Sequence, residues 1–233
     1  MINRPRGRRN IPNVLLSFGR HLVYAEGTKT EPLYVEDLKA FASEELSVSK
    51  DDIEIVSVKA AKSKHTIDLV KYAIEDVKKR KKKSETITDV WVFYDKDDFE
   101  DFDEAFRLIK EQGKNDSDIA WHACWSNECF EVWVYHYFEN LQTAMSRKNY
   151  IDKINGFLKE KGCRKKYKKN MEGLHHFLTV YGGSIEKATK WMKKKDEDSK
   201  SDKKPNPSSG IYQFAEFILA YIKNKKSKEA KRS

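Results

Sequence analysis

The segment VWVFY, residues 90–94, is a short run of β-branched and aromatic residues that stops at Asp95. Its composition is typical of a strand that is covered on both faces of a sheet. A second compact run, SFGRHLVYA at residues 17–25, predicts another buried strand and leads directly into Glu26 and Gly27. Two predicted strands therefore end at a carboxylate.

Helical patterns separate these strands, because apolar residues recur there at three- and four-residue spacing. The predicted order after Gly27 is a helix from residue 30, a strand at 53–58, a helix at 67–77, the strand at 90–94, a helix from about 105 that ends at Gly113, a strand at 119–125, a turn at 126–127 and a helix through 130–137. Alternating strands and helices predict an α/β fold, with a mostly parallel sheet flanked by helices. The carboxyl ends of parallel strands share one edge, where such folds bind ligands.

The predicted strands stop near residue 140, and charge changes at the same place. Residues 1–140 carry a net charge of −5 and residues 141–233 a net charge of +14. Helices are expected at 150–161, 171–180, 185–195 and 211–222, with a solvated linker at 196–209. We therefore expect four parts, which are a basic arm (1–15), an α/β core (16–140), a mainly helical basic extension packed on the core (141–222) and a basic tail (223–233).

Basic side chains are concentrated enough to suggest nucleic acid as a partner, because a positive surface attracts phosphate backbones. Residues 78–83 are six consecutive basic side chains. A second group follows in the extension: Arg164, Lys165, Lys166, Lys168 and Lys169. The alternative for each run is a solvated helix face. Lys29 and Lys96, each beside a predicted acidic ligand, are either phosphate contacts or ordinary surface lysines.

Several protein classes do not fit the sequence. It contains no apolar stretch of membrane-spanning length, and the arginine-rich start has no apolar run like that of a signal peptide. The three cysteines lack CxxC spacing, which disfavours a disulfide framework. We therefore expect a cytoplasmic protein without a membrane partner.

A divalent cation is the ligand that the acidic residues favour. Asp95 and Asp97 lie two residues apart at a strand end, and Glu26 lies at another. Carboxylate oxygens suit Mg²⁺ or Mn²⁺, and Mg²⁺ sites commonly use one or two carboxylates together with water and substrate phosphates. The alternatives are helix caps for the aspartates and a turn residue for Glu26, which could also act as a general acid or base.

Other candidate ligands are less specific. His122, Cys124 and Cys129 lack the spacing of a closed zinc site and are expected to be buried. The adjacent His175 and His176 have no predicted partner that would make them catalytic. The tryptophans could stack on bases, but their apolar neighbours favour a place in the core for most of them.

Four motifs resemble one known family when their order and spacing are taken together. They are EGTKTEPLY at 26–34, YDKDDF at 94–99, SNECFEVW at 126–133 and NPSSGIY at 206–212. This combination resembles the RloB-like family, a branch of the Toprim superfamily of bacterial defence proteins. The resemblance covers nearly the whole chain. It implies a Toprim-like, Rossmann-like core that binds Mg²⁺ for nuclease chemistry, often encoded beside an ABC-class ATPase in abortive-infection systems against phage.

The resemblance also implies roles for individual residues. Glu26 matches the superfamily glutamate, a metal ligand and acid/base, and Asp95 and Asp97 match its DxD metal ligands. Glu131 matches the acidic residue of the signature Ser-Asn-Pro-x-Phe-Glu and could support a second metal ion. Glu128 stands where that signature has proline. Because it lies three residues before Glu131, we expect both glutamates on one helix face, where Glu128 either joins the site or favours the helix N-terminus.

Two functions remain open on the sequence alone. The first is a Mg²⁺-dependent nuclease whose catalytic residues are Glu26, Asp95 and Asp97, with RNA, including tRNA, favoured over DNA by analogy. The second is a non-catalytic module that senses nucleic acid or a nucleotide and regulates a partner ABC-class ATPase. A topoisomerase or primase is disfavoured, because the chain has no room for the accessory domains of those enzymes.

Overall fold

The computed structural model of the chain describes residues 20–46, 53–57, 66–96, 100–199 and 204–229. The predicted basic arm at 1–15 lies outside these ranges, as do Asp97 and the last four residues of the predicted tail. The elements, in chain order, are β1 (His21–Ala25), α1 (Thr30–Leu46), β2 (Ile53–Ser57), α2 (Thr66–Lys82), β3 (Asp89–Asp95), α3 (Phe102–Asn115), β4 (Ala120–Asn127), α4 (Glu131–His136), α5 (Arg147–Glu160), α6 (Leu174–Val180), α7 (Ile185–Asp198), β5 (Ser208–Ser209) and α8 (Tyr212–Glu229).

The described strands form one sheet in the order β2-β1-β3-β4-β5. The first four run parallel, and the two-residue β5 pairs antiparallel with the end of β4. The predicted α/β fold with a mostly parallel sheet is therefore confirmed. In the register, Ala25 lies beside Phe93, and Asp95 lies beside Ser126. The ends of β1, β3 and β4 consequently meet at one edge, which we call the carboxyl edge.

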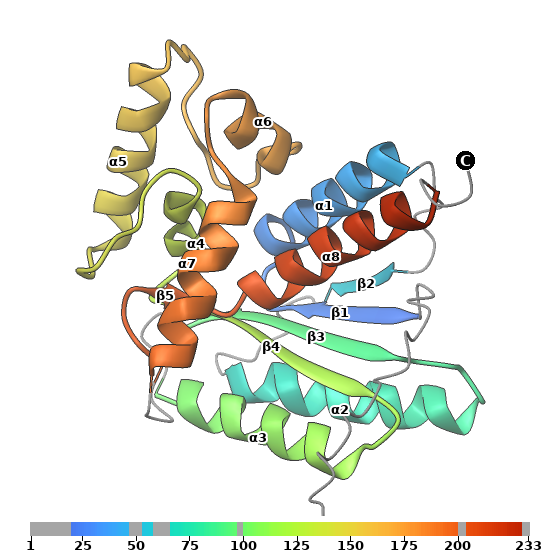
Figure 1. Cartoon of the computed structure of the whole chain (residues 1–233). Helices are drawn as coiled ribbons and strands as arrows, with labels where there is room; N and C mark the ends of the chain where they lie inside the picture. The colour runs from blue at the N-terminus through green and yellow to red at the C-terminus, as the bar shows by residue number, and fades with distance from the viewer. Residues whose placement is uncertain (1–19, 47–52, 58–65, 97–99, 200–203, 230–233) are drawn as a thin grey trace, which may run out of the picture.

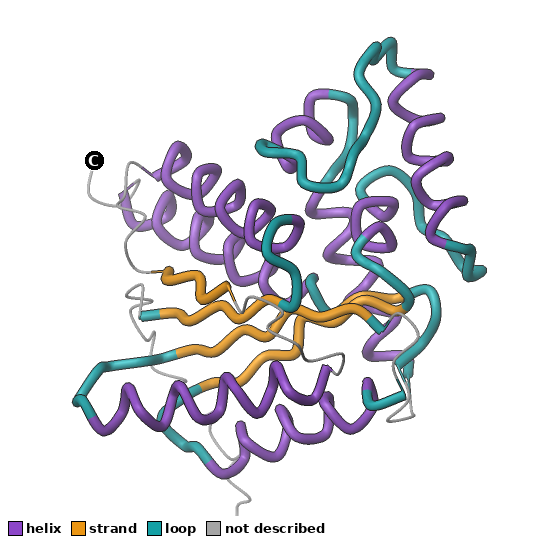
Figure 2. The backbone as a smooth tube through the Cα atoms, turned by 180° about the vertical axis from the view of Figure 1, so that it is seen from behind, coloured by secondary structure: helices purple, strands orange, loops and turns teal. Residues whose placement is uncertain are grey.

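Helices cover both faces of the sheet, with α2 and α3 on one face and α1 and α8 on the other (Figures 1 and 2). Successive strand residues alternate between these layers, as the two-residue period of a strand requires. Tyr24 and Val92 pack in the cluster with α2 and α3, whereas Val23 and Phe93 pack in the cluster with α1 and α8. This double burial is why the strands are apolar on both faces.

The helices α4, α5, α6 and α7 form a group to one side of these layers, which α4 and β5 connect to the end of β4 (Figure 1). The final helix, α8, packs against α7 of this group and also covers the sheet. It packs along α1, and its Phe214 contacts the rings of Trp91 and Phe93 edge to face, at 5.1 and 5.6 Å between centroids. Part of the predicted extension therefore completes the core of the sheet layer.

Several predicted boundaries differ from the structure. Ser126 and Asn127 form the end of β4 instead of a turn, because Ser209 and Ser208 pair with them. The helix α3 continues past Gly113 to Asn115. At the chain's end α8 extends through Glu229, beyond residue 222, where we expected a basic tail to begin. The predicted solvated linker at 196–209 includes the buried Ser208 and Ser209.

No helix within the described ranges combines the length and apolarity that a membrane span requires.

Candidate active site

Glu26 and Asp95 come together at the carboxyl edge. The N–H of Glu26 donates to the carbonyl oxygen of Phe93 at 3.0 Å, which extends the pairing of β1 with β3 by one residue. The Glu26 side chain then turns toward β3, and its Oε2 accepts a hydrogen bond of 3.3 Å from the N–H of Asp95. Glu26 and Asp95 are two of the four predicted metal ligands, and the structure brings the carboxylate of one to the main chain of the other, although 69 positions separate them in sequence.

The third predicted ligand, Asp97, lies outside the described residues. Its neighbour Lys96 is half-buried, and the Lys96 N–H donates to the carbonyl oxygen of Ser126 at 2.9 Å. This bond keeps the chain after β3 paired to β4 for one residue beyond the strand. The backbone directly after Asp95 is thus held at the carboxyl edge.

Glu131 contributes a fully buried carboxylate at the first residue of α4, with 0% of the residue exposed. The hydroxyl of Tyr167 donates to its Oε1 at 3.4 Å, and the Nζ of Lys169 lies 3.7 Å from the same oxygen. A buried carboxylate needs such partners, because an unpaired charge in the interior is costly. Both partners come from the segment between α5 and α6.

Arg147 connects Glu131 to Asp95. Its Nε lies 3.8 Å from Glu131 Oε2, and its Nη2 lies 3.8 Å from Asp95 Oδ2. These distances exceed those of hydrogen bonds, so the contacts are ion pairs with space between the groups. The Arg147 side chain is 36% exposed and therefore reaches both carboxylates and solvent. The sequence patterns did not mark Arg147, because a single arginine at a helix start carries no signal.

Negative charge at this site also affects neighbouring groups. The pKa of the Cys129 thiol is raised to about 12, first by burial and then by the charges of Glu131 and Asp95. Burial raises the pKa of Tyr167 well above its ordinary value, and Glu131 raises it further. Both groups therefore stay protonated at neutral pH, which leaves Tyr167 as a hydrogen-bond donor to Glu131.

Glu31 is a further acidic residue that sequence reasoning missed. It lies in the first turn of α1 and is 8% exposed. A Cβ atom on residue 27 would clash with Glu31 Oε2, so the glycine allows this carboxylate to approach the chain directly after Glu26. No pattern could have singled it out, since acidic residues are common in the first turns of helices.

Most of the predicted basic residues are exposed, but they differ in their contacts with this edge. Arg164, Lys165, Lys166 and Lys168 are exposed, as is Lys169, the member of this group that contacts Glu131. Lys29 is also exposed and lines a pocket of about 510 Å³ together with Asn170. A hydrogen bond of 3.0 Å from Thr30 Oγ1 to Asn170 Oδ1 connects the start of α1 to this basic segment.

Acidic side chains balance part of the positive charge of the basic run at residues 78–83. Ion pairs join Lys78 to Glu75 at 3.0 Å, Arg80 to Asp76 at 2.8 Å and Lys81 to Asp116 at 3.0 Å. These contacts favour a solvated, ion-paired helix face over a dedicated nucleic-acid surface.

The other candidates fall into structural roles. Cys124 and Cys129 are buried, as expected, and are not paired with each other. His122 was expected to be buried but is 24% exposed, because its Nε2 reaches out to donate a 2.8 Å hydrogen bond to the Asp89 carboxylate. Glu128 precedes the N-cap of α4, so it does not share a helix face with Glu131 as we expected. The tryptophans at 91, 125 and 133 are buried in the core.

The carboxylates at this edge suit a hard divalent cation by their chemistry. Within the described residues, no three His, Cys, Asp or Glu side chains form a group that could hold a metal ion. Glu26 and Asp95 offer two carboxylates, which matches the one or two that Mg²⁺ commonly uses while it keeps water and phosphate ligands. The two carboxylates therefore fit a Mg²⁺ ion whose remaining ligands are water and phosphate oxygens.

The comparisons with known proteins identify the family of the chain. Residues 21–218 match the family model described as RloB-like protein, a span that includes Glu26, Asp95, Glu131 and Arg147. No curated protein and no solved structure matches the chain.

Proposed function

The chain belongs to the RloB-like protein family, and from that premise we propose that it is a Mg²⁺-dependent nuclease of the Toprim type. Its substrate is a nucleic-acid phosphodiester, with RNA, including tRNA, favoured over DNA. Its role is in bacterial defence against phage. The substrate preference and the role rest on the family resemblance.

One observation carries the proposal, namely the hydrogen bond between the Glu26 carboxylate and the Asp95 N–H. It holds two acidic side chains at the carboxyl edge, where parallel α/β sheets place ligands. The Glu26 carboxylate thereby positions the strand end that carries Asp95. Asp97 follows two residues later, so a third carboxylate is available in sequence.

In the proposed reaction, Glu26 and Asp95 hold the cation, with Asp97 as a further ligand. The bound ion would polarise the scissile phosphate and lower the pKa of an attacking water. Arg147 and Lys169 bind the non-bridging phosphate oxygens, since both ammonium and guanidinium groups pair well with phosphate. The Glu131 carboxylate holds the side chains of Arg147 and Lys169 in place. Because Glu131 already pairs with two positive side chains, the proposed site uses one metal ion instead of two.

A second candidate is a non-catalytic module that binds nucleic acid or a nucleotide and regulates a partner ABC-class ATPase. The observation that favours it is the neutralisation of Asp95 and Glu131 by Arg147 and Lys169. Such an arrangement can hold an anion without turnover. Tight metal-dependent binding without product, together with stable co-purification of an ATPase, would identify this function.

The test is cleavage of mixed RNA and DNA substrates by the full chain with Mg²⁺ or Mn²⁺. Glu26→Gln and Asp95→Asn remove one charge each, and Glu111→Gln, at an exposed position of α3, is the matched control. We expect cleavage by the parent and the control, and none by the site variants. Equal cleavage by all four proteins would remove this site from consideration.

A further inference from the structure

A pocket lies between the start of α1 and the segment that precedes α6, and we call it the α1 pocket. Its volume is about 510 Å³, and the described residues that line it come from 28–36 and from 170–172. Pockets that bind small molecules have volumes of roughly 300–1,000 Å³. The α1 pocket is therefore large enough for one nucleotide.

Both walls of the α1 pocket continue into the proposed active site. Thr28 follows Glu26 by two residues, so their Cα atoms lie within about 7 Å of each other. On the other wall, Asn170 directly follows Lys169, whose Nζ lies 3.7 Å from Glu131 Oε1. A strand whose phosphate lies at Glu26 and Lys169 would therefore have its next nucleotide beside the α1 pocket.

A hydrogen bond between the two walls occupies the side-chain oxygen of Asn170. The donor is Thr30 Oγ1, at 3.0 Å from Asn170 Oδ1. Asn170 has a φ of 63°, in the left-handed region that asparagine enters more readily than most residues. Within the described residues its Nδ2 has no partner. The amide nitrogen of Asn170 is therefore the group of this side chain that remains to donate to a ligand.

Two exposed side chains of opposite charge, Lys29 and Glu172, line the α1 pocket. Neither forms an ion pair with another residue in the part of the chain that the structure describes. The further carboxylate of this pocket, Glu36, lies 3.0 Å from the Nζ of Lys39 and is paired with it. The lining therefore favours a ligand that carries both a negative group and hydrogen-bond donors.

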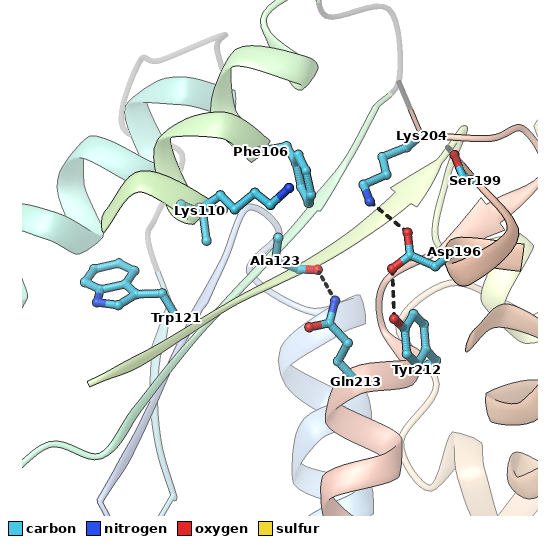
Figure 3. A pocket seen from close by; sticks show the side chains of 10 residues that line it. Phe106, Lys110, Trp121, Ala123, Asp196, Ser199, Lys204, Tyr212 and Gln213 are labelled. Atoms are coloured by element: carbon cyan, nitrogen blue, oxygen red, sulfur yellow. Dashed lines mark hydrogen bonds and ion pairs between the residues drawn. The ribbon is translucent and has the colours of Figure 1, made fainter. Parts of the chain in front are cut away.

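A second pocket, of about 500 Å³, lies beside β4, and Figure 3 shows that its polar side chains pair with one another. Asp196 Oδ1 lies 2.7 Å from Lys204 Nζ, and Asp196 Oδ2 accepts a 2.8 Å hydrogen bond from the Tyr212 hydroxyl. These contacts join α7 and α8 to the segment before β5. The polar groups there thus connect parts of the fold, in contrast to Lys29 and Glu172.

We propose that the α1 pocket binds a guanine nucleotide of the substrate strand, next to the phosphate that is cleaved. Lys29 pairs with the phosphate of this nucleotide. The base packs on Pro32, which is buried, and on Leu33, which is half-buried. This base preference rests on the proposed nuclease function and adds a substrate class to it, namely strands with an unpaired guanine beside the cut.

Guanine matches the polar lining because its Watson–Crick edge presents two neighbouring donors, N1 and N2, beside the acceptor O6. A carboxylate accepts two hydrogen bonds at once, so Glu172 suits the two donors, and the Nδ2 of Asn170 suits O6. Adenine and cytosine each present one amino donor on this edge, and uracil and thymine present one donor between two acceptors. These bases therefore leave an oxygen of the carboxylate without a partner.

The experiment is cleavage of single-stranded RNA and DNA of random sequence by the full chain with Mg²⁺ or Mn²⁺, followed by sequencing of the product ends. At one fixed position beside the cut, we expect strands with guanine to be cleaved about tenfold faster than strands with each other base, which corresponds to one charge-assisted hydrogen bond. Cleavage with equal rates for the four bases would overturn the guanine preference and leave the nuclease function standing.

Two variants assign the preference to the pocket. Glu172→Gln removes the carboxylate, and Asn170→Asp removes the amide donor while it keeps the oxygen that Thr30 contacts and a residue that tolerates the left-handed backbone. Each should reduce the preference for guanine to about twofold or less, whereas Glu111→Gln, exposed on α3, should keep it. A guanine preference that persists in both pocket variants would overturn the assignment.

Calorimetric titration without divalent metal separates the pocket from the nuclease function. If the parent cleaves no strand, the nuclease function fails, and the affinities for the four nucleoside monophosphates then decide whether the pocket recognises guanine. Binding of guanosine monophosphate about tenfold more tightly than the other three, with this difference lost in Glu172→Gln, supports recognition of guanine by the pocket. Equal affinities for the four, or no binding of any, would overturn it.

Discussion

The Oε2 of Glu26 accepts a hydrogen bond of 3.3 Å from the main-chain N–H of Asp95, between the ends of two adjacent parallel strands. The acceptor is a side chain and the donor is backbone. The Glu26 carboxylate therefore lies at the main chain of Asp95, the last residue of β3. Structural and chemical contributions of Glu26 can be separated by substitution, since only one of them needs the negative charge.

Replacement of Glu26 by glutamine should abolish cleavage with little loss of stability. Glutamine keeps an oxygen that can accept the Asp95 N–H, but it removes the charge that a cation needs. We expect at least about a 100-fold lower cleavage rate, by comparison with the loss of one electrostatic group in other enzymes. The free energy of unfolding, measured by urea denaturation, should change by less than about 1 kcal/mol.

Glu26→Ala provides the comparison for that result. It removes the acceptor as well as the charge, so the Asp95 N–H loses its partner and stability should fall by a further 1 kcal/mol or so. If Glu26→Gln cleaved at the parent rate, the carboxylate would have only the structural role.

Substitution of Gly27 tests the close approach of Glu31. Gly27→Ala would place a Cβ against Glu31 Oε2, so the buried carboxylate must move. We expect a loss of about 1–2 kcal/mol in the free energy of unfolding and a lower cleavage rate, because overpacking displaces a group at the carboxyl edge. Thermal unfolding and initial rates measure the two effects.

Gly156→Ala in α5 is the matched control. A Cβ there meets nothing within 4 Å, and the residue lies inside a helix. The substitution should stabilise the protein by about 0.5–1 kcal/mol, because alanine loses less backbone entropy than glycine. If Gly27→Ala and Gly156→Ala changed the free energy of unfolding by similar amounts, Gly27 would not be required for the position of Glu31.

Stability should decline when the pH falls from about 6.5 to about 4, in part because of His175. Burial lowers the pKa of this side chain to about 4. The unfolded chain therefore binds a proton in this interval that the folded protein does not bind. The stabilisation is complete above the unfolded pKa and is lost toward pH 4, with a slope near 1.4 kcal/mol per pH unit.

His175→Gln isolates this contribution. Glutamine does not titrate and can still bond to the Tyr137 hydroxyl, which lies 3.2 Å from His175 Nδ1. We expect a shallower dependence of the unfolding free energy on pH in this variant, and no change in His176→Gln, where the neighbouring side chain is exposed. An unaltered slope in His175→Gln would mean that the buried ring can take up a proton in the folded state.

Arg147 should contribute to both substrate binding and turnover, since it lies 3.8 Å from Asp95 and from Glu131. Arg147→Ala should weaken nucleic-acid binding and reduce the slope of log affinity against log salt by about 0.7–0.9, the loss of one phosphate contact. Cleavage at saturating substrate should fall as well. Lys148→Ala, an exposed neighbour, should leave saturated cleavage unchanged. The same decrease in both variants would assign Arg147 to general charge attraction only.

The apolar patterns predicted most of the sheet layer, because they depend on local periodicity. Residues 90–94 lie within β3, and Glu26 directly follows β1, as the alternation of strands and helices indicated. The parallel arrangement then followed from connection rules, which is why the meeting of Glu26 with Asp95 could be anticipated.

The remaining features depend on tertiary contacts that no local pattern contains. Ser126 and Asn127 are polar residues typical of turns, but they are strand residues here because distant serines pair with them. Arg147 belongs to the site only because α5 begins beside α4. The pocket beside β4 likewise combines side chains of α3 and α8 with Lys204, which are far apart in sequence.

The most direct measurement is the affinity of Mn²⁺ for the parent, Glu26→Gln, Asp95→Asn and the double variant, followed by paramagnetic resonance of the free ion. If the two carboxylates share one cation, each single substitution should weaken binding at least about tenfold, and the double variant should be weaker by clearly less than the product of the two effects, because coupled groups are not additive. Undiminished Mn²⁺ binding in the single variants, or none by the parent, would contradict a shared cation at Glu26 and Asp95.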